Sequence, residues 1–496
     1  MRGRNDWGAK IIALLTGTAM LWSLTACGQQ QPDPTPTTTA STTTDTGQAA
    51  ILLPNDGITL SQSTPLNKWT KLSAALENAL NDDGFSDKDI TTVKSKTLDD
   101  QTKAVTDYID NRDDNRPATI IIAPVAQPDD TTRQYGDYIT QTLRTSTDDT
   151  TGDDTTQAQQ AASLSQALAK AKDDGIHVIL VSNTIDGYTP DAYVGMSTIR
   201  EIAHTQASLL ADKLVLSKAT KDNPKSIEIL LPSNGDDTAD QEAFAGIWEV
   251  LGPYFATGAA VSPSGLLNTT SDETSWNQIT FTGTDKDSAQ AALTTRLKTD
   301  THTHQPIDGV LAMNDLVASG ATAALADLGY EGTAADINPK ITIGGIVDNI
   351  AGNKDLKKEK VPEPQKTESE QTEEPDGAED TSGDDQSTPV VDDPAWPIVT
   401  GYGAYPSNLA AVVNGQQWST GLERRDDYAK AIATASVALN DDRKLTSVKD
   451  LSLSGTTEMN GTQVPTIHLS LQSVSASNLK SALIDAGYIS AADAGL

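Results

Sequence analysis

Short, continuous apolar segments alternate with amphipathic segments along most of this 496-residue chain. The apolar segments are rich in β-branched residues and lack the polar–apolar alternation of strands that are covered on one face only. They begin at Ile51, Thr119, His177, Ser226, Gly309 and Pro397. This alternation continues over roughly 400 residues, which is more chain than one sheet accommodates. It predicts an α/β fold of two doubly wound parallel-sheet lobes that are joined by a hinge.

The amphipathic segments predict the helices, and Gly84, Gly175 and Gly329 mark the ends of three of them. The predicted helices span Lys68–Asp82, Leu98–Asp110, Ala161–Asp174, Ile199–Lys218, Gln241–Leu251, Ser288–Lys298 and Leu316–Leu328. In open α/β sheets, ligands bind outside the carboxyl ends of the strands. Polar residues that directly follow an apolar segment are therefore the candidates for a binding site.

Net charge and residue counts exclude several classes of function. The chain has 36 basic and 69 acidic side chains, a net charge of −33, which disfavours nucleic acid and anionic membrane surfaces as partners. Its single cysteine excludes a disulfide framework and a cysteine-rich metal site. The nucleotide, serine-hydrolase and zinc-protease motifs are absent, and His302 and His304 lack carboxylate partners for a metal. We therefore expect no enzyme, no cofactor and no metal site.

The N-terminus has the features of a secretory signal. Basic residues precede the apolar segment Ile11–Leu24, which is too short and too interrupted for a membrane span. The sequence Leu24–Cys27 resembles the lipobox of bacterial lipoproteins. The resemblance implies that residues 1–26 are a signal peptide and that Cys27 carries a diacylglycerol anchor. We then expect the protein on the outer face of the cytoplasmic membrane, as at a Gram-positive surface.

Three segments of biased composition interrupt the pattern. Residues 27–49 are almost free of apolar side chains and predict a disordered tether. Residues 361–393 hold twelve acidic residues against one lysine and predict a disordered acidic insert within the C-terminal lobe. The insert is interpreted as a solvated loop or as a segment that binds a partner or a cation. The Asp/Thr-rich stretch 129–156 predicts a smaller insertion.

From Ile51 on, seven segments in order resemble the type I periplasmic binding proteins, and within them the xylose and multiple-monosaccharide binding proteins of ABC importers. The clearest are "NKWTKLSAALENALNDDGF", "AMNDLVASGATAALADLGY" and "PIVTGYGAYPSNLAAVVNGQQWST". The resemblance implies an N-terminal lobe of residues 50–198 and 421–450. It implies a C-terminal lobe of residues 199–420 and 451–496.

Four motifs depart from the family where its members use charged or amide groups to bind sugar hydroxyls. The departures are Val181-Ser182-Asn183, Met196-Ser197-Thr198, Asp236-Asp237-Thr238-Ala239 and Gly401-Tyr402-Gly403-Ala404. Buried hydroxyls require such partners. The ligand is therefore expected to carry fewer or differently placed hydroxyls than the family's sugars.

Position after a strand, together with the resemblance, nominates eight ligand-binding residues: Lys68, Trp69, Asn183, Asp237, Asn314, Asp315, Tyr402 and Gln417. Five of them also have an alternative structural role. Trp69 could belong to the core of the first helix, and Asp315 and Asp237 could be helix N-caps. Asn183 and Gln417 could be ordinary loop residues.

The resemblance implies a monomeric substrate-binding protein of an ABC importer, which closes its lobes on a monosaccharide or related polyol and docks on a membrane permease. Two alternatives stay open. One is a sensory receptor on the same fold that signals to a membrane partner. The other is a surface module that has lost ligand binding, as the four altered motifs suggest.

Overall fold

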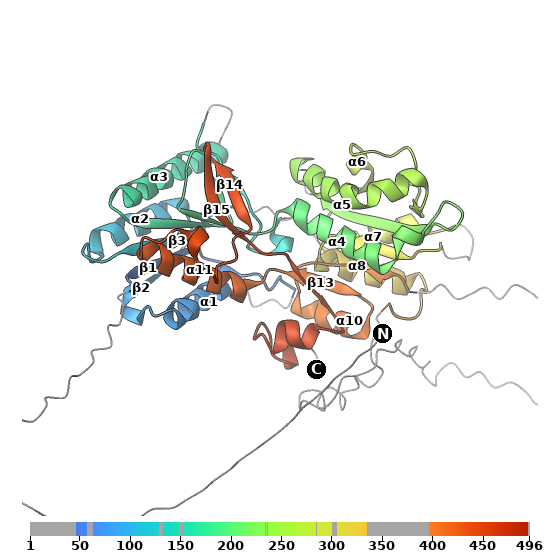
Figure 1. The fold of residues 1–496 in the computed structure, drawn as a ribbon. Helices are drawn as coiled ribbons and strands as arrows, with labels where there is room; N and C mark the ends of the chain where they lie inside the picture. Colours follow the sequence, from blue (N-terminus) through green and yellow to red (C-terminus); the bar gives the residue numbers. More distant parts are fainter. Residues whose placement is uncertain are drawn as a thin grey trace, which may run out of the picture. The chain divides into compact units, whose positions relative to one another are not determined.

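The structure is a computed structural model that describes residues 46–56, 63–127, 132–147, 152–233, 235, 237–283, 285–299, 305–334 and 396–494. From Thr46 on, the chain forms one compact unit. The predicted signal peptide, Cys27 and the acidic insert lie outside the described residues. Both lobes contain a parallel sheet with helices on its two faces (Figure 1), so the predicted α/β class is confirmed.

The sheet of the first lobe has seven strands in the order β14-β15-β7-β5-β3-β1-β2, and only β14 runs antiparallel to its neighbour. Its strands are β1 (Gln48–Pro54), β2 (Ile90–Ser95), β3 (Ala118–Ile122), β5 (His177–Val181), β7 (Ala192–Gly195), β14 (Gly455–Met459) and β15 (Thr462–His468). The chain order reverses between β1 and β3, which makes their carboxyl ends the switch point where ligands bind in such sheets.

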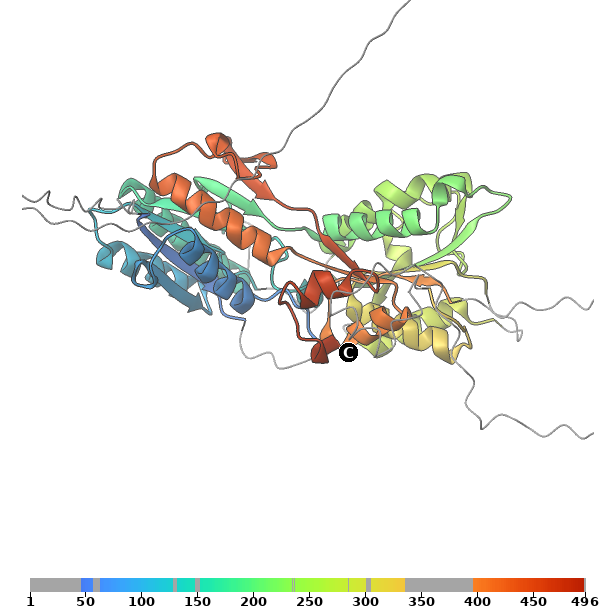
Figure 2. The ribbon, with the colours of Figure 1, turned by 60° about the horizontal axis from the view of Figure 1, so that its bottom comes forward.

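Helices cover both faces of this sheet. α1 (Trp69–Asp82) and α11 (Arg425–Asn440) pack together on one face, whereas α2 (Leu98–Asn111) and α3 (Asp153–Asp173) share the other face (Figure 2). Strands β1, β3 and β5 are almost wholly buried, because their apolar side chains fill a core on each face. α11 returns from the C-terminal part of the chain to this lobe.

The sheet of the second lobe has the order β10-β8-β11-β12, with β9 paired to the start of β8. Its strands are β8 (Lys225–Ser233), β9 (Ala260–Val261), β10 (Thr280–Thr282), β11 (Gly309–Ala312) and β12 (Ile398–Val399). The helices are α4 (Ile199–Lys213), α5 (Asp237–Thr257), α6 (Trp276–Ile279), α7 (Lys286–Leu297) and α8 (Asp315–Asp327). α4 and α5 pack on one face, and α7 and α8 pack on the other.

Two small sheets complete the fold. β13 (Ser419–Leu422) pairs antiparallel with β16 (Gln472–Ser475), and with α10 (Leu409–Asn414) and the last helical turns they enclose a separate small core. β4 (Thr142–Leu143) pairs with β6 (Thr184–Ile185) beside the first sheet. The chain crosses between the lobes near Ser197, Glu423 and Ser470.

Three predicted boundaries are wrong. Residues 455–468 do not belong to the C-terminal lobe, because β15 pairs with β7 and extends the first sheet. The tether reaches no further than residue 47, since Gln48 already pairs in β1. Within 129–156, Tyr135 and Tyr138 are buried, and α3 begins at Asp153 rather than at Ala161. Here two aromatic side chains that pack into the cores outweigh an Asp/Thr-rich composition.

Two kinds of feature are absent from the described residues. No helix among them is long and apolar enough to cross a membrane. No group of three or more His, Cys, Asp or Glu side chains among them is placed to hold a metal ion.

Candidate functional site

A cleft of about 600 Å³ opens at the carboxyl ends of β1 and β3, the switch point of the first sheet. Asn55 and Asp56 follow β1 on one side of it, and Val125 to Gln127 follow β3 on the other. Leu316 and Tyr405 reach it from the second lobe. Small-molecule sites in proteins have volumes of roughly 300–1,000 Å³, so the cleft has the size of a ligand site.

Lys68 and Trp69, at the start of α1, line this cleft as predicted. The Nζ atom of Lys68 lies 3.2 Å from Oδ1 of Asp137, and both side chains are largely buried. Burial raises the pKa of Asp137, and the charge of Lys68 partly offsets that rise. The indole of Trp69 packs against the ring of Tyr138 with centroids 5.0 Å apart and belongs to the core. Trp69 therefore both lines the cleft and packs in the core.

Asn183 also lines the cleft, at the carboxyl end of β5. Its Oδ1 accepts a hydrogen bond from the backbone N–H of Gln141 at 3.0 Å, and its Nδ2 donates to the carbonyl of Pro124 at 2.8 Å. The preceding Ser182 has a φ of 58°, a left-handed conformation that is uncommon outside glycine. Its hydroxyl donates to the Tyr138 carbonyl at 2.8 Å. Asn183 thus fastens two loops that form the rim of the cleft.

The two lobes meet at the back of the cleft through Gln134. Its Oε1 accepts from Nδ2 of Asn314 at 2.9 Å, and its carbonyl accepts from the hydroxyl of Tyr405 at 2.7 Å. The Nε2 of Gln134 is buried without a partner among the described residues. A buried donor of this kind is costly to leave unpaired. The Nε2 amide of Gln134 can therefore donate a hydrogen bond to an acceptor oxygen of a ligand.

Asn314, not Asp315, caps α8, so the predicted cap is corrected. Oδ1 of Asn314 accepts from the N–H of Val317 at 3.0 Å, which is the bond of an N-cap. The strand β11 ends at Ala312, and the helix begins one residue after Asn314. The cap therefore falls on Asn314.

Asp315 and Gln417 form a buried network behind the cleft and do not line it. Oδ1 of Asp315 accepts from Nε2 of Gln417 at 2.7 Å, and Oδ2 accepts from Tyr405 N and Thr420 Oγ1 at 2.8 and 2.9 Å. Burial still raises the pKa of Asp315 to about 6. A Cβ on Gly401 would lie 2.3 Å from both Asp315 and Gln417, so this position requires glycine.

The last two predicted residues also lie off the cleft. Tyr402 is buried, and its hydroxyl accepts from Nδ2 of Asn67 at 3.1 Å. Burial raises the pKa of Tyr402 well above its usual value. Asp237 is exposed at the first residue of α5. The structure therefore brings Lys68, Trp69 and Asn183 together, places four others in buried contacts beside them, and leaves Asp237 apart.

Sequence reasoning missed most of the polar lining. The missed residues are Asn55, Asp56, Lys96, Gln127, Arg133, Gln134, Asp137, Gln141 and Tyr405. The rule that ligands meet the residues after each strand could have found Asn55, Asp56 and Gln127. Arg133, Gln134 and Asp137 lie in the stretch interpreted as an insertion, so no signal pointed to them.

Amide, carboxylate and ammonium groups thus surround an opening that also touches aromatic rings. Amides and carboxylates can pair with hydroxyl groups, and Lys68 or Arg133 can donate to oxygen atoms. Trp69 and Tyr405 provide apolar surface at its edges. The arrangement is suited to holding a small polar molecule.

Comparison with known families places a periplasmic binding protein domain at residues 155–356, about two fifths of the chain. The predicted resemblance to periplasmic binding proteins is therefore confirmed over this part of the chain. The matched model describes a binding domain rather than an enzyme, in agreement with the expectation of no enzyme. A comparison with curated protein sequences finds no match.

Solved structures of solute-binding proteins cover most of the chain at low identity. One is an ABC transporter solute-binding protein from Clostridium phytofermentans with bound β-D-glucose, at 19% identity and a TM-score of 0.48, covering 90% of this chain and 99% of that one. A carbohydrate transporter solute-binding protein from Chloroflexus aurantiacus, in complex with D-glucose, has the same identity and TM-score and covers 90% and 97%. One from Bacillus halodurans with bound myo-inositol has 16% identity and a TM-score of 0.41, covering 88% and 98%.

Proposed function

The chain carries a periplasmic binding protein domain, and on that premise we propose that it captures a small solute of the monosaccharide or polyol class for an ABC importer. The protein acts as a monomer that is anchored outside the cell membrane through a diacylglycerol at Cys27 and delivers its solute to a membrane permease. The cleft at the switch point between β1 and β3 is the single observation that carries the proposal.

The composition of the cleft supports this class of solute. Hydroxyl groups are met best by side chains that both donate and accept, and Asn55, Gln127 and Gln134 are of this kind. The buried, unpartnered Nε2 of Gln134 favours a ligand with an acceptor oxygen at the back of the cleft. The apolar edges supplied by Trp69 and Tyr405 fit the C–H faces of a sugar ring.

The predicted ligand residues then divide into two roles. Lys68 and Gln134 contact the solute, Trp69 supplies surface, and Asn183 holds the rim. The other four act through their neighbours. Asn314 holds Gln134 and Asp315 holds Tyr405 from behind. Gln417 bonds Asp315, and the hydroxyl of Tyr402 bonds Asn67. Closure requires solute contacts from both lobes. A ligand shifts the equilibrium between the open and closed forms only by the extra affinity that it has for the closed form.

A thermal-shift screen over pentoses, hexoses, inositols and other polyols tests the proposal. A solute present at a hundredfold excess over its Kd stabilises the protein by about 2.7 kcal/mol. Lys68→Met should weaken binding of the best solute by roughly 5- to 150-fold in calorimetry, the range for one buried partner. Asp237→Asn, on the exposed start of α5, is the matched control and should bind normally.

Two results would contradict the proposal. If no sugar or polyol raises the melting temperature, the solute class is wrong. If a solute binds and both variants bind it equally, the cleft is not its site. A sensory role on the same fold is the second candidate, and binding of the liganded protein to a permease rather than to a signalling receptor distinguishes the two.

A further inference from the structure

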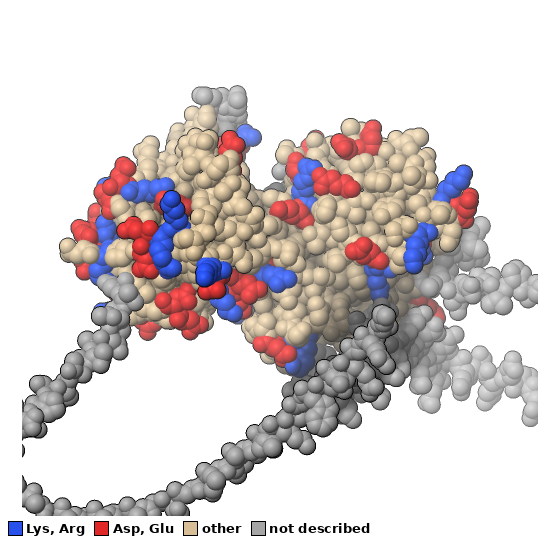
Figure 3. Space-filling model, in the orientation of Figure 1, with Lys and Arg blue, Asp and Glu red and all other residues tan. Residues whose placement is uncertain are grey.

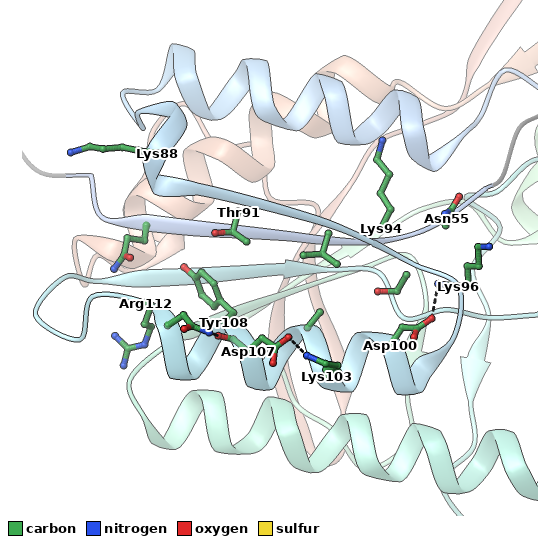
Figure 4. A pocket seen from close by; sticks show the side chains of 15 residues that line it. Asn55, Lys88, Thr91, Lys94, Lys96, Asp100, Lys103, Asp107, Tyr108 and Arg112 are labelled. Carbon is green, nitrogen blue, oxygen red and sulfur yellow. Dashed lines mark hydrogen bonds and ion pairs between the residues drawn. The ribbon is translucent and has the colours of Figure 1, made fainter.

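A second groove, of about 670 Å³, runs along β2 and α2 on the first lobe (Figure 4). Thr91, Val93 and Ser95 of β2 form one side, and the other side comes from α2 and from Arg112, which directly follows it. It shares only Asn55 and Lys96 with the solute cleft, and none of the other residues proposed to bind the solute lines it. The groove is therefore separate from the solute cleft in its walls and floor.

Basic side chains predominate in this groove, although the protein as a whole is strongly acidic. Five cations line it (Lys88, Lys94, Lys96, Lys103 and Arg112) against two carboxylates, Asp100 and Asp107. Asp107 pairs with Lys103, and Asp100 accepts from the backbone N–H of Lys96. Lys88, Lys94 and Lys96 are exposed and form no ion pair with another described residue. On the face drawn in Figure 3, by contrast, basic and acidic side chains are interspersed.

Three polar groups at the groove are buried without a partner. They are the hydroxyls of Ser95 and Tyr108 and the Nε of Arg112, each without a hydrogen bond to any described residue. Ser95 is 2% exposed and Tyr108 7% exposed. Unpaired buried donors cost free energy, so such a cluster indicates a site that is completed by something else. All three groups can donate to an oxygen acceptor.

β2 is also an edge strand. It pairs with β1 and with no other described strand, so its outer backbone groups are open to pairing with an added strand. A groove with an open strand edge, donors in its floor and cations around it suits an extended, acidic polypeptide that adds to the sheet. A compact anion would use the cations but not the strand edge.

The chain itself contains a segment with this chemistry. Residues 361–393 hold twelve acidic side chains and one lysine, and they lie between Ala334 and Trp396. Before this segment, 26 residues (335 to 360) connect it to Ala334, and after it only residues 394 and 395 connect it to Trp396. At up to about 3.3–3.6 Å per extended residue, its N-terminal part therefore has the longer reach. We propose that the groove between β2 and α2 binds the N-terminal part of the acidic segment 361–393 of the same chain as an added strand.

Hydrogen exchange on the whole protein tests this inference. One variant replaces residues 361–393 by a short Gly/Ser bridge. Amides of β2 should exchange several-fold faster in this variant than in the intact chain at low salt. β14, the opposite edge of the same sheet, is the internal control and should not change. Raising the salt should reduce the difference, because it screens exposed charges.

Charge variants separate this binding from a general effect of deletion. In the intact chain, replacing four lysines of the groove should reproduce the faster exchange of β2. The replacements are Lys88→Gln, Lys94→Gln, Lys96→Gln and Lys103→Gln. The matched control carries Gln at four exposed lysines elsewhere, Lys218, Lys430, Lys444 and Lys449, and should behave as the wild type. Tyr108→Phe should weaken the protection of β2 without loss of stability, since its hydroxyl has no partner to lose.

Adding the segment back decides the outcome. A synthetic peptide of residues 361–393 should restore the protection of β2 in the deletion variant, and a peptide with Asn and Gln for Asp and Glu should not. Equal exchange of β2 in the intact and deleted chains would overturn the proposal. Protection that grows with protein concentration would overturn it as well, because the segment would then come from a second copy.

Discussion

Ser197 and Glu423 join two of the segments that cross between the lobes: the backbone N–H of Ser197 donates to Oε1 of Glu423 at 2.8 Å. Glu423 is 1% exposed, and its Oε2 has no partner among the described residues. Burial raises the pKa of the Glu423 carboxyl to about 7. A group that titrates near neutral pH thus lies at the point about which the lobes would turn.

Glu423→Gln should flatten the dependence of stability on pH. The folded protein keeps a proton on Glu423 at pH values where the unfolded chain, with a pKa near 4.3, has lost it. The contribution of Glu423 is fully present below about pH 4.3 and is lost as the pH rises to about 7. At pH 8 the variant should be more stable than the wild type by on the order of 3–4 kcal/mol, and at pH 4 the two should be equal.

Urea unfolding between pH 4 and pH 8 measures this difference. Asp315 also has a raised pKa, so the quantity to compare is the wild type minus the variant, in which the Asp315 contribution cancels. Glu458→Gln, on the exposed side of β14, is the matched control and should follow the wild type. If the free energy of unfolding varies with pH in the same way in the wild type and in Glu423→Gln, the buried carboxyl is charged and the prediction is wrong.

Asp315→Ala and Asn314→Ala should differ in stability although the residues are adjacent. Removing Asp315 leaves the Tyr405 N–H and the Gln417 amide short of an acceptor, at a cost of about 2–4 kcal/mol. Removing Asn314 mainly loses a helix cap, which costs about 1 kcal/mol. Unfolding midpoints in urea rank the two, and a larger loss for Asn314→Ala would contradict the network that the structure shows.

Tyr405→Phe should loosen the contact between the lobes and leave each lobe folded. The hydroxyl of Tyr405 donates to the Gln134 carbonyl at 2.7 Å, and its loss costs about 0.5–1.5 kcal/mol. The radius of gyration of the solute-free protein, measured by X-ray scattering, should rise as more molecules open. Unfolding of the two lobes should stay unchanged, and an unaltered radius of gyration would mean that other contacts hold the lobes.

The fold was predictable because its strands are coded by local, continuous apolar runs. β1, β3, β5, β8 and β11 lie where Ile51, Thr119, His177, Ser226 and Gly309 indicated. β14 and β15 were misassigned because pairing with β7 is a long-range choice that their own residues do not encode. The site was only half predictable: Lys68 and Asn183 follow from position, whereas Gln134 and Tyr405 meet only once the lobes are folded.

Cys27→Ser tests the anchor, which lies outside the described residues and rests on the sequence alone. Two acyl chains hold a protein stably at a membrane, whereas one chain binds weakly and reversibly. Without the thiol no diacylglycerol can attach, so the variant should leave the membrane fraction or accumulate as an uncleaved precursor. Fractionation and intact-mass measurement separate these outcomes, because the precursor keeps residues 1–26 and the wild type gains the mass of the lipid.

Solute binding by a form that begins at residue 46 should equal that of the anchored protein, since every residue that lines the cleft follows Thr46. A processed Cys27→Ser protein that stays in the membrane fraction would contradict lipid anchoring at this cysteine.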